Sequence, residues 1–134
     1  MKYFIDSNII IYFLKGQYPS LTTYFIQTHI EDIYIPAIVK AELLFGIQKS
    51  KLKRENREKY LQFLAPFEII PFDNKAALSY SLIRSELECK GNPIGPNDLM
   101  IAAIVHSRSG TLVTHNTKEF AKVPGLFVAD WTLN

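Results

Sequence analysis

Asp6 is the first acidic residue of the chain whose position suits chemistry. It directly follows the apolar run Tyr3–Ile5, which has the composition of a buried strand, and it opens a polar triplet with Ser7 and Asn8. A carboxylate in this place can cap the helix that follows. Ser7 or Asn8 can make the same cap without carrying a charge. We therefore expect Asp6 to be free for another role, as a ligand of a cation.

Glu42 falls on a helix face that is otherwise apolar. The stretch Ala37–Gln48 has the pattern of a helix, and the spacing of three and four places Ile38, Glu42 and Phe45 on one side of it. Removing a carboxylate from water is costly unless a basic group or a bound cation compensates. Glu42 is therefore a second candidate ligand. The alternatives are a salt bridge to a Lys or Arg and a side chain that bends out to solvent.

Asp98 stands at the start of a helix that is apolar nearly all round. Pro96 suits the first helical position and puts Asp98 in the first turn, where a carboxylate complements the helix dipole. Asp98 also shares its face with Ile101 and Val105, which directs it towards the core. The dipole explains the residue in structural terms, but a charged side chain directed inward favours a functional role.

Glu119 follows the expected strand Thr111–Val113, near its carboxyl end. Asn116 and Glu119 have the spacing of a capping box, so Glu119 could serve only to cap a short helix. Its position beyond a strand end favours a site instead, because ligands of parallel sheets bind at that edge. Thr114 and Asn116 offer neutral oxygens beside it, which suit a water or a metal contacted through water.

The four candidates share one chemistry, since all their ligand atoms are oxygens. Carboxylates that lie close together raise one another's pKa unless a cation neutralises them. Oxygen ligands without Cys or a clear His suit Mg²⁺ or Mn²⁺ rather than zinc. These ions polarise phosphoryl oxygens and activate water, so the set indicates hydrolysis of a phosphodiester or a phosphomonoester. Its members are Asp6, Glu42, Asp98 and Glu119.

The elements that must position these residues alternate between strand and helix patterns. Such alternation is typical of a parallel sheet with helices on both faces, and short strands without apolar/polar alternation fit full burial. We expect strands at Lys2–Ile5, Ile33–Ile35, Glu68–Ile70, Thr111–Val113 and Leu126–Val128. We expect helices at Asn8–Lys15, Ser20–His29, Ala37–Gln48, Lys53–Leu64, Asn74–Lys90, Leu99–Ser109 and Thr117–Ala121.

The composition is that of one globular domain. Of 134 residues, 48% are hydrophobic and 21% charged, which allows a buried core and argues against disorder. The apolar runs are shorter than a membrane span and no signal peptide is evident, so we expect a cytoplasmic protein. A lone cysteine, Cys89, excludes an internal disulfide and a Cys-based metal site.

Basic residues are concentrated in the segment Lys49–Lys59. The net charge of the chain is only +2, which permits a polyanionic partner without demanding one. Six Lys and Arg residues fall in this segment, offset by Glu55 and Glu58. The segment either forms a solvated helix face or contacts the phosphates of a nucleic acid.

The order of these motifs resembles the PIN-domain ribonucleases, and specifically the VapC toxins of bacterial and archaeal toxin–antitoxin pairs. The resemblance covers residues 1–134 as a single PIN domain. It is carried, in the family's order, by Phe4–Asn8, Val39–Gly46, Ile94–Ala103, Leu112–Phe120 and the tail Val123–Trp131.

The resemblance implies a three-layer α/β/α fold around a central parallel five-stranded sheet, with the acidic residues at one end. It assigns Asp6, Glu42 and Asp98 as metal-binding catalytic carboxylates. The fourth acidic position of the family is often Asp and here is Glu119, which leaves open direct ligation, ligation through water, and capping only. Polar positions that orient carboxylates or water correspond to Asn8, Thr114 and Asn116.

The same resemblance implies a reaction and partners. The reaction is cleavage of structured RNA, often transfer RNA, by an endoribonuclease that needs Mg²⁺ or Mn²⁺ and thereby inhibits translation. Such RNAs are cut in loops, where unpaired bases can be splayed out. The implied partners are a cognate VapB-type antitoxin that occludes the cleft and a second copy of the chain in a homodimer.

Three other functions remain open from the residues. A metal-dependent phosphatase or phospho-receiver domain is also α/β, but the phosphatase class needs a second Asp where Asn8 stands. A metal-free ribonuclease would use His106 or His115 as acid and base, and it would leave Glu42 unexplained. A PIN-like binding module without activity would keep the fold and lose the chemistry.

Overall fold

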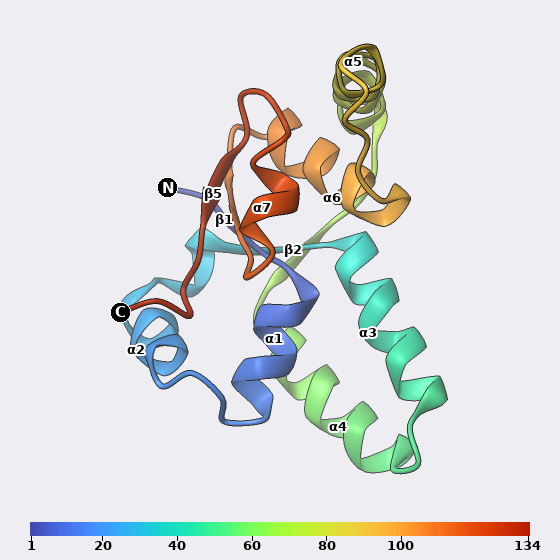
Figure 1. Cartoon of the computed structure of the whole chain (residues 1–134). Coiled ribbons are helices and arrows are strands. Elements are labelled where there is room, and N and C mark those ends of the chain that lie inside the picture. The colour runs from blue at the N-terminus through green and yellow to red at the C-terminus, as the bar shows by residue number, and fades with distance from the viewer.

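The computed structural model describes residues 1–134, in five strands and seven α-helices (Figure 1). The strands are β1 (Tyr3–Ile5), β2 (Ile33–Pro36), β3 (Glu68–Ile70), β4 (Thr111–Val113) and β5 (Phe127–Ala129). The helices are α1 (Ser7–Leu14), α2 (Ser20–Gln27), α3 (Ala37–Lys49), α4 (Lys53–Leu64), α5 (Asn74–Cys89), α6 (Pro96–Ser107) and α7 (Thr117–Phe120). A short 3₁₀ turn, η1 (Ile30–Asp32), precedes β2.

All five strands run parallel, in the spatial order β3-β2-β1-β4-β5. The chain first adds β2 and β3 on one side of β1, and then returns to place β4 and β5 on the other side. The strand order therefore reverses between β1 and β4. In open parallel sheets this reversal opens a crevice at the carboxyl ends of the strands, where ligands bind. The expected five-stranded parallel sheet is confirmed.

Strands β1 and β4 end together at this reversal. Ile5 lies opposite Val113, and the Asp6 N–H continues the pairing by donating to the Val113 carbonyl at 2.9 Å. The residues that follow the two strands, Asp6 and Thr114, therefore leave the sheet side by side. The topology alone brings these two polar residues together.

Helices cover both faces of the sheet, as expected for three layers. In Figure 1, α1, α2 and α4 lie below the strands, and α5 and α6 lie on the opposite side. Helix α6 packs along α5 and against β2 and β4, and α3 packs on α1 and α4. The core between the layers is aliphatic, and each fully buried side chain of this kind contributes about 1.5–3 kcal/mol. Its central members are Phe4, Ile5, Ile35, Ile101, Leu112 and Val113.

The edges of the sheet depart from the expectation of full burial. Phe127 on β5 is 67% exposed, and Glu68 at the start of β3 is also exposed, because each edge strand has a neighbour on one side only. Helix α6 begins at Pro96, which agrees with Pro96 at the first helical position and lies before the expected boundary at Leu99; β5 begins one residue later than expected. None of the helices has the length and apolar character needed to cross a membrane.

Candidate active site

Asp6 lies where the strand order reverses, immediately after β1. The residue is 4% exposed, and both of its carboxylate oxygens accept hydrogen bonds. Oδ1 accepts from the Ser7 N–H at 2.8 Å. Oδ2 accepts from the Thr114 hydroxyl at 2.7 Å and from the Asn8 side-chain amide at 3.4 Å. Burial raises the pKa of Asp6 above its ordinary value, and the bonds from Thr114 and Ser7 oppose this rise.

Asp6 is itself the N-cap of α1, so the expectation that Ser7 or Asn8 would cap this helix is wrong. The cap uses Oδ1 alone and leaves Oδ2 turned towards Thr114 and Asn8. Capping and a role in the site are compatible because the two oxygens face different partners. Ser7 is free for another contact, and its hydroxyl donates to Glu42 Oε1 at 3.3 Å.

Glu42 lies beside Asp6 at the boundary of the core. The buried face of α3 consists of Val39, Leu43 and Ile47. Phe45 is 64% exposed, so the apolar face expected to be buried around Glu42 instead lines an open groove. Glu42 takes part in none of the ion pairs of the chain, which rules out the salt-bridge alternative. Burial and then the charge of Asp6 raise its pKa, while hydrogen bonds from Asn97 and Ser7 lower it.

Asp98 occupies the first turn of α6, as Pro96 at the helix start predicts. The side chain is half-buried, and its pKa is raised from 3.8 to about 6. Burial is the largest cause, followed by the charges of Asp6, Glu42 and Glu119 in that order. Three carboxylates from widely separated parts of the chain are therefore close enough to Asp98 to raise its pKa.

Glu119 lies on α7 with its side chain 27% exposed. A capping box would direct the Asn116 N–H to Glu119, but this N–H donates to the Thr114 hydroxyl at 3.0 Å, and the Asn116 side chain makes no cap. The alternative that Glu119 only caps a helix is therefore wrong. Glu119 Oε2 instead pairs with Lys122 Nζ at 3.2 Å, so a cation of the chain already neutralises part of its charge.

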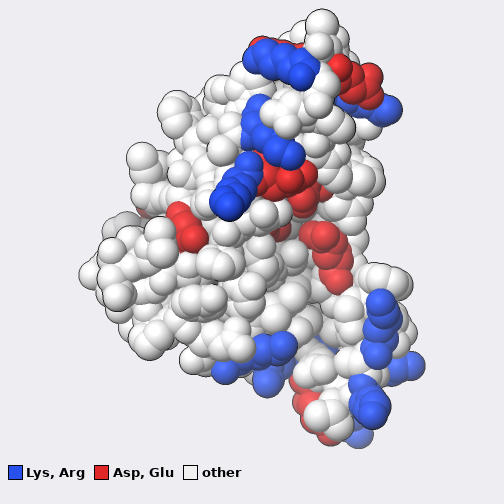
Figure 2. All heavy atoms as spheres, viewed as in Figure 1, with Lys and Arg blue, Asp and Glu red and all other residues white.

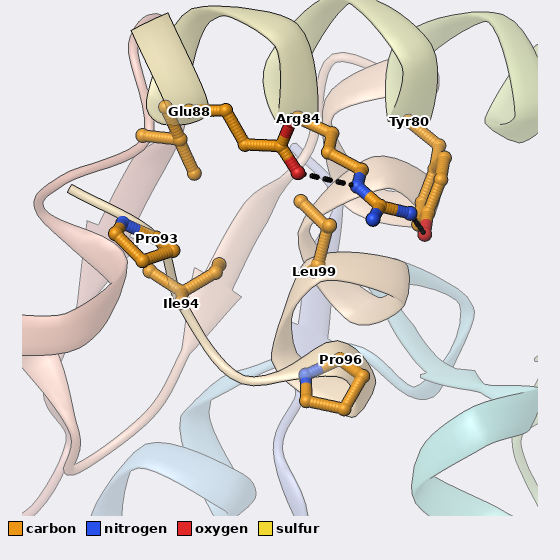
Figure 3. A pocket seen from close by; sticks show the side chains of 8 residues that line it. Tyr80, Arg84, Glu88, Pro93, Ile94, Pro96 and Leu99 are labelled. Carbon is orange, nitrogen blue, oxygen red and sulfur yellow. Dashed lines mark hydrogen bonds and ion pairs between the residues drawn. The ribbon is translucent and has the colours of Figure 1, made fainter. Parts of the chain in front are cut away.

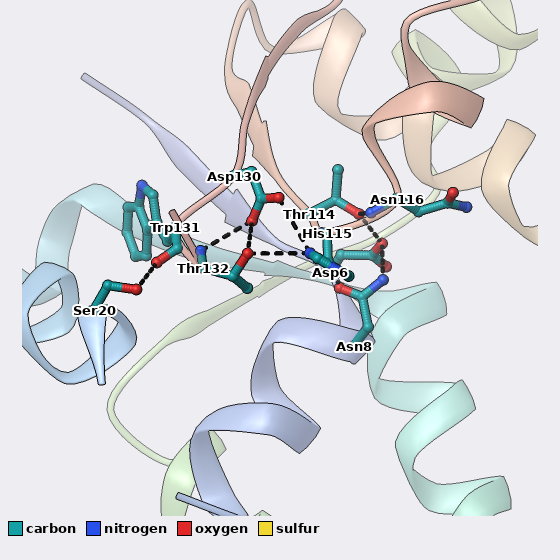
Figure 4. A network of polar contacts seen from close by, with 9 residues as sticks. All are labelled: Asp6, Asn8, Ser20, Thr114, His115, Asn116, Asp130, Trp131 and Thr132. Carbon is teal, nitrogen blue, oxygen red and sulfur yellow. Dashed lines mark hydrogen bonds and ion pairs between the residues drawn. The ribbon is translucent and has the colours of Figure 1, made fainter. Parts of the chain in front are cut away.

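Two of the three polar residues expected to orient the site contact Asp6 directly. The Thr114 oxygen accepts from Asn116, so its hydrogen is directed to Asp6. The Asn8 amide forms a bridge, since its Oδ1 accepts from the His115 N–H at 3.2 Å while its Nδ2 donates to Asp6. Asn116 contributes its backbone N–H only, and its exposed side chain points away from Asp6 (Figure 4).

The donor set fits a hard divalent cation, because its oxygens are partly buried and its charges repel. No three His, Cys, Asp or Glu side chains are placed so that all could ligate one ion together. The carboxylates therefore approach one another without closing into a ready-made cage. Repulsion between like charges holds such groups apart, and a divalent cation is the kind of ligand that offsets it.

Charge is divided across the face that carries these carboxylates. Figure 2 shows acidic atoms across its middle, with basic atoms above them over α7 and below them around the ends of α1 and α3 and along α4. A groove of about 340 Å³ between α1, α3 and α4 reaches Glu42 and carries Lys15 and Lys59 on its walls. Asn56 and Tyr60 add further hydrogen-bonding groups to this groove. A polyanionic ligand that crosses this face can therefore contact Lys and Arg side chains on both sides of the four carboxylates.

The two histidines considered for metal-free catalysis lie in other surroundings. The His106 Nδ1 contacts the Ser79 hydroxyl at 3.3 Å, between α5 and α6. The His115 ring turns away from Asp6 towards Asp130 and Thr132 (Figure 4). Neither ring forms a hydrogen bond with any of the four carboxylates, so the structure does not assemble an acid–base pair of histidines.

A separate pocket of about 260 Å³ lies between α5 and the loop that enters α6 (Figure 3). Ile94 and Leu99 form apolar walls, and the Arg84–Glu88 ion pair, 2.9 Å long, spans its rim. Arg84 also donates to the Tyr80 hydroxyl at 2.9 Å. The charged groups of this pocket satisfy one another, and none of the four carboxylates lines it. It is not part of the acidic site.

Three contacts of the site were not predicted from the sequence. Asn97 contacts Glu42. Its position directly before Asp98 is the only local feature of the sequence that could have indicated a place in the site. The bond from Ser7 to Glu42 joins residues 35 positions apart. The bond from the His115 N–H to Asn8 spans 107 positions. Contacts between residues so far apart in the sequence depend on the order of the strands, and no local sequence pattern indicates them.

Comparisons with known proteins identify the family of the chain. The PIN domain family model matches residues 3–126. Ribonuclease VapC2 of Rickettsia felis is 40% identical over 135 residues, covering 98% of each protein. The tRNA(fMet)-specific endonuclease VapC of Salmonella typhimurium is 33% identical over 131 residues, again covering 98% of each. The crystal structure of VapBC2 from Rickettsia felis bound to a DNA fragment from their promoter contains a chain that superposes with a TM-score of 0.90 at 39% identity, covering 98% of this chain and 99% of that one. The chain belongs to the PIN-domain family and, within it, to the VapC ribonucleases.

Proposed function

We propose that this protein is a metal-dependent endoribonuclease, the toxin of a toxin–antitoxin pair, which hydrolyses phosphodiester bonds in structured RNA and thereby inhibits translation. In this proposal residues 1–134 act as a single PIN domain. The observation that carries it is the convergence of four carboxylates on one place: burial raises the pKa of Asp98, and the charges of Asp6, Glu42 and Glu119 raise it further. Folding alone gives no reason to gather four carboxylates at the reversal of a parallel sheet.

Asp6, Glu42 and Asp98 are the proposed ligands of Mg²⁺ or Mn²⁺, with Glu119 contributing directly or through a water. When bound, the ion supplies a Lewis acid that polarises a phosphoryl oxygen and lowers the pKa of the attacking water. The all-oxygen donor set supports a hard cation over zinc. The products expected from this chemistry carry a 5′-phosphate and a 3′-hydroxyl.

The part played by the chain itself is to hold the carboxylates before the substrate arrives. Ser7 and Thr114 hold the two oxygens of Asp6, and Ser7 also contacts Glu42. Side chains that are already oriented do not have to reorganise as the transition state forms. The free energy of that reorganisation is therefore not added to the activation barrier. Because burial and the neighbouring carboxylates raise the pKa of Asp98 to about 6, this carboxyl ionises only as the pH approaches neutrality.

The proposed substrate is RNA with unpaired loops, and transfer RNA or another RNA of translation is the expected target. One relative is named a tRNA(fMet)-specific endonuclease, and another a ribonuclease. The groove that carries Lys15 and Lys59 reaches Glu42, so phosphates beside the scissile bond can contact these lysines while the bond lies at the carboxylates.

The proposed partner is a VapB-type antitoxin that covers the cleft when the toxin is held inactive. Its support is the solved VapBC2 complex, whose toxin chain shares the fold over nearly the whole length. The family resemblance supports a homodimer in the cytoplasm as the setting of this reaction.

Expression of the chain without an antitoxin tests the proposal. We expect growth arrest within one generation, and sequencing of RNA 5′ ends after brief induction is expected to show new 5′-phosphate ends in the loops of a few RNAs. The Asp98→Asn variant is the matched control and is expected to leave growth and RNA ends unchanged. Normal growth in the presence of verified, folded wild-type protein would overturn the proposal.

A further inference from the structure

A chain of hydrogen bonds connects the C-terminal segment to Asp6 (Figure 4). The Asp130 side chain is only 8% exposed and has three polar contacts. The Thr132 N–H and the Thr132 hydroxyl donate to its Oδ1 at 2.9 and 2.7 Å, and the His115 ring approaches its Oδ2 at 3.2 Å. Asp130 is thus a nearly buried carboxylate whose partners are already within the fold, and it lies outside the acidic site.

These contacts fix the hydrogen on the His115 ring. Nδ1 lies 3.2 Å from an Asp130 oxygen and 3.1 Å from the Thr132 hydroxyl. An ionised carboxylate can only accept, and the single hydrogen of the Thr132 hydroxyl is already donated to Asp130. Nδ1 must therefore carry a hydrogen, and its bond to Asp130 holds the His115 ring in one orientation.

The backbone of His115 in turn fixes the amide of Asn8. The His115 N–H donates to Asn8 Oδ1 at 3.2 Å, so the NH₂ end of this amide is the end that faces Asp6. With the amide turned round, two donors would meet at His115 and two acceptors at Asp6. The orientation of the Asn8 amide is therefore set at one end by Asp6 and at the other by the His115 N–H in the loop after β4.

The C-terminal segment is held firmly enough to serve as an anchor. The Trp131 side chain is 3% exposed and stacks on Tyr24 with ring planes 4° apart, and its carbonyl accepts from the Ser20 hydroxyl at 2.8 Å. Strand pairing reaches the same region, because the Thr114 N–H donates to the Ala129 carbonyl at 2.9 Å. Residues on both sides of Asp130 are thus fixed to the body of the domain.

We propose that Asp130 and Thr132 are positioning residues of the nuclease centre, which act through His115 and Asn8 to hold Asp6 in its orientation towards the other carboxylates. This inference rests on the proposed function, because kcat is measured on RNA cleavage. The path from Asp130 to Asp6 rests on the hydrogen bonds described above. It extends the site to the C-terminal segment, to residues that form no hydrogen bond with any of the four carboxylates.

Isosteric substitutions test this path. Thr132→Val removes the hydroxyl at nearly constant volume, Thr132→Ser restores it, and Asp130→Asn places a donor against the His115 ring. We expect Thr132→Val and Asp130→Asn to weaken Mn²⁺ binding and to lower kcat by about tenfold each, with KM for RNA unchanged. Thr132→Ser is expected to behave as wild type. Leu133→Ala, in the same segment but 62% exposed, is the matched control and is expected to be silent.

Mn²⁺ affinity, measured by calorimetry without RNA, separates this inference from the proposed function. A wild-type protein that binds Mn²⁺ but cleaves no RNA would overturn the proposed function alone. Wild-type Mn²⁺ affinity in Thr132→Val and Asp130→Asn, or an equal loss in Leu133→Ala, would overturn the positioning role. If a variant does not fold, long-range ¹H–¹⁵N NMR of the wild-type imidazole decides: hydrogen on Nδ1 is expected, and a ring protonated only on Nε2 contradicts the path.

Discussion

The Thr114 hydroxyl donates to Asp6 Oδ2 at 2.7 Å, across 108 positions of sequence. The two residues meet because β1 and β4 are paired in register and end together. Thr114 is fully buried, its oxygen accepts from the Asn116 N–H, and its hydroxyl hydrogen is directed to Asp6. This bond joins the two strands at which the order of the sheet reverses, and it fixes one oxygen of the most buried carboxylate in the site.

Replacing Thr114 by Val is expected to damage both catalysis and stability. The substitution keeps the shape of the side chain, but Asp6 loses a donor and the Asn116 N–H loses its acceptor. We expect a fall in kcat of about 10- to 100-fold and a loss of about 1–2 kcal/mol in the free energy of unfolding. RNA cleavage rates and urea denaturation measure the two effects. Thr114→Ser retains the hydroxyl and is expected to retain most of both; a Thr114→Val protein with wild-type kcat would show that the hydroxyl has no part in the site.

Asp98→Asn is expected to stabilise the metal-free protein at neutral pH. Folding raises the pKa of Asp98 from 3.8 to about 6, so the folded state holds its proton more tightly than the unfolded state does. This carboxyl therefore favours folding below pH 4, and the benefit is lost as the pH rises to about 6. We expect the variant to gain about 1–2 kcal/mol at pH 7.5 in EDTA, after allowing for solvent screening of a half-buried group. Urea denaturation at pH 7.5 and pH 4 measures the difference; an equal gain at both values would mean that charge is not its cause.

Metal affinity is expected to fall as the medium becomes acidic. A proton on Asp98 competes with a divalent cation, and the raised pKa of Asp98 places this competition near pH 6. Burial also raises the pKa of Asp6 and of Glu42, which adds to the effect. We expect Mn²⁺ binding at pH 5 to be about tenfold weaker than at pH 7, measured by calorimetry at constant ionic strength. Equal affinity at the two pH values would exclude Asp98 as a ligand.

Within the basic segment Lys49–Lys59, only part is expected to contact RNA. Lys59 lines the groove that reaches Glu42, whereas Arg54 is 91% exposed and pairs with Glu58 at 3.6 Å. We expect Lys59→Gln to raise KM for RNA and to reduce the slope of log affinity against log salt by about 1, because one phosphate contact is lost. Arg54→Gln changes the net charge equally and is expected to leave KM close to wild type. The same loss in both variants would indicate a general effect of charge.

Much of the fold could be predicted from the sequence, because each strand and helix carries its own local signal. Pro96 marks the start of α6 and places Asp98 in its first turn, as the structure confirms. The order of the strands has no such signal in the sequence. The strands are three or four residues long and lack apolar/polar alternation, so their sequences do not indicate which strand pairs with which. The contact between Asp6 and Thr114 depends on that order.

The sequence indicated which acidic residues gather at the edge of the sheet, but not the contacts that they make there. Reasoning from spacing treated the cap and the ligand role of Asp6 as exclusive, but a carboxylate has two oxygens and uses them separately. Spacing also placed Glu42 on a buried face, whereas Phe45 beside it is 64% exposed. A helix pattern shows which residues share a face and cannot show whether a neighbouring element covers it.

Cleavage of RNA by the purified protein with and without a divalent cation tests the proposed chemistry most directly. We predict that wild-type protein cleaves its target in Mg²⁺ or Mn²⁺ to leave 5′-phosphate ends, that EDTA abolishes cleavage, and that a folded Asp98→Asn protein shows no detectable cleavage. Because this variant is expected to be more stable than wild type, loss of activity cannot be attributed to unfolding. Cleavage that persists in EDTA, or in Asp98→Asn with the metal present, would contradict catalysis by a metal held at these carboxylates.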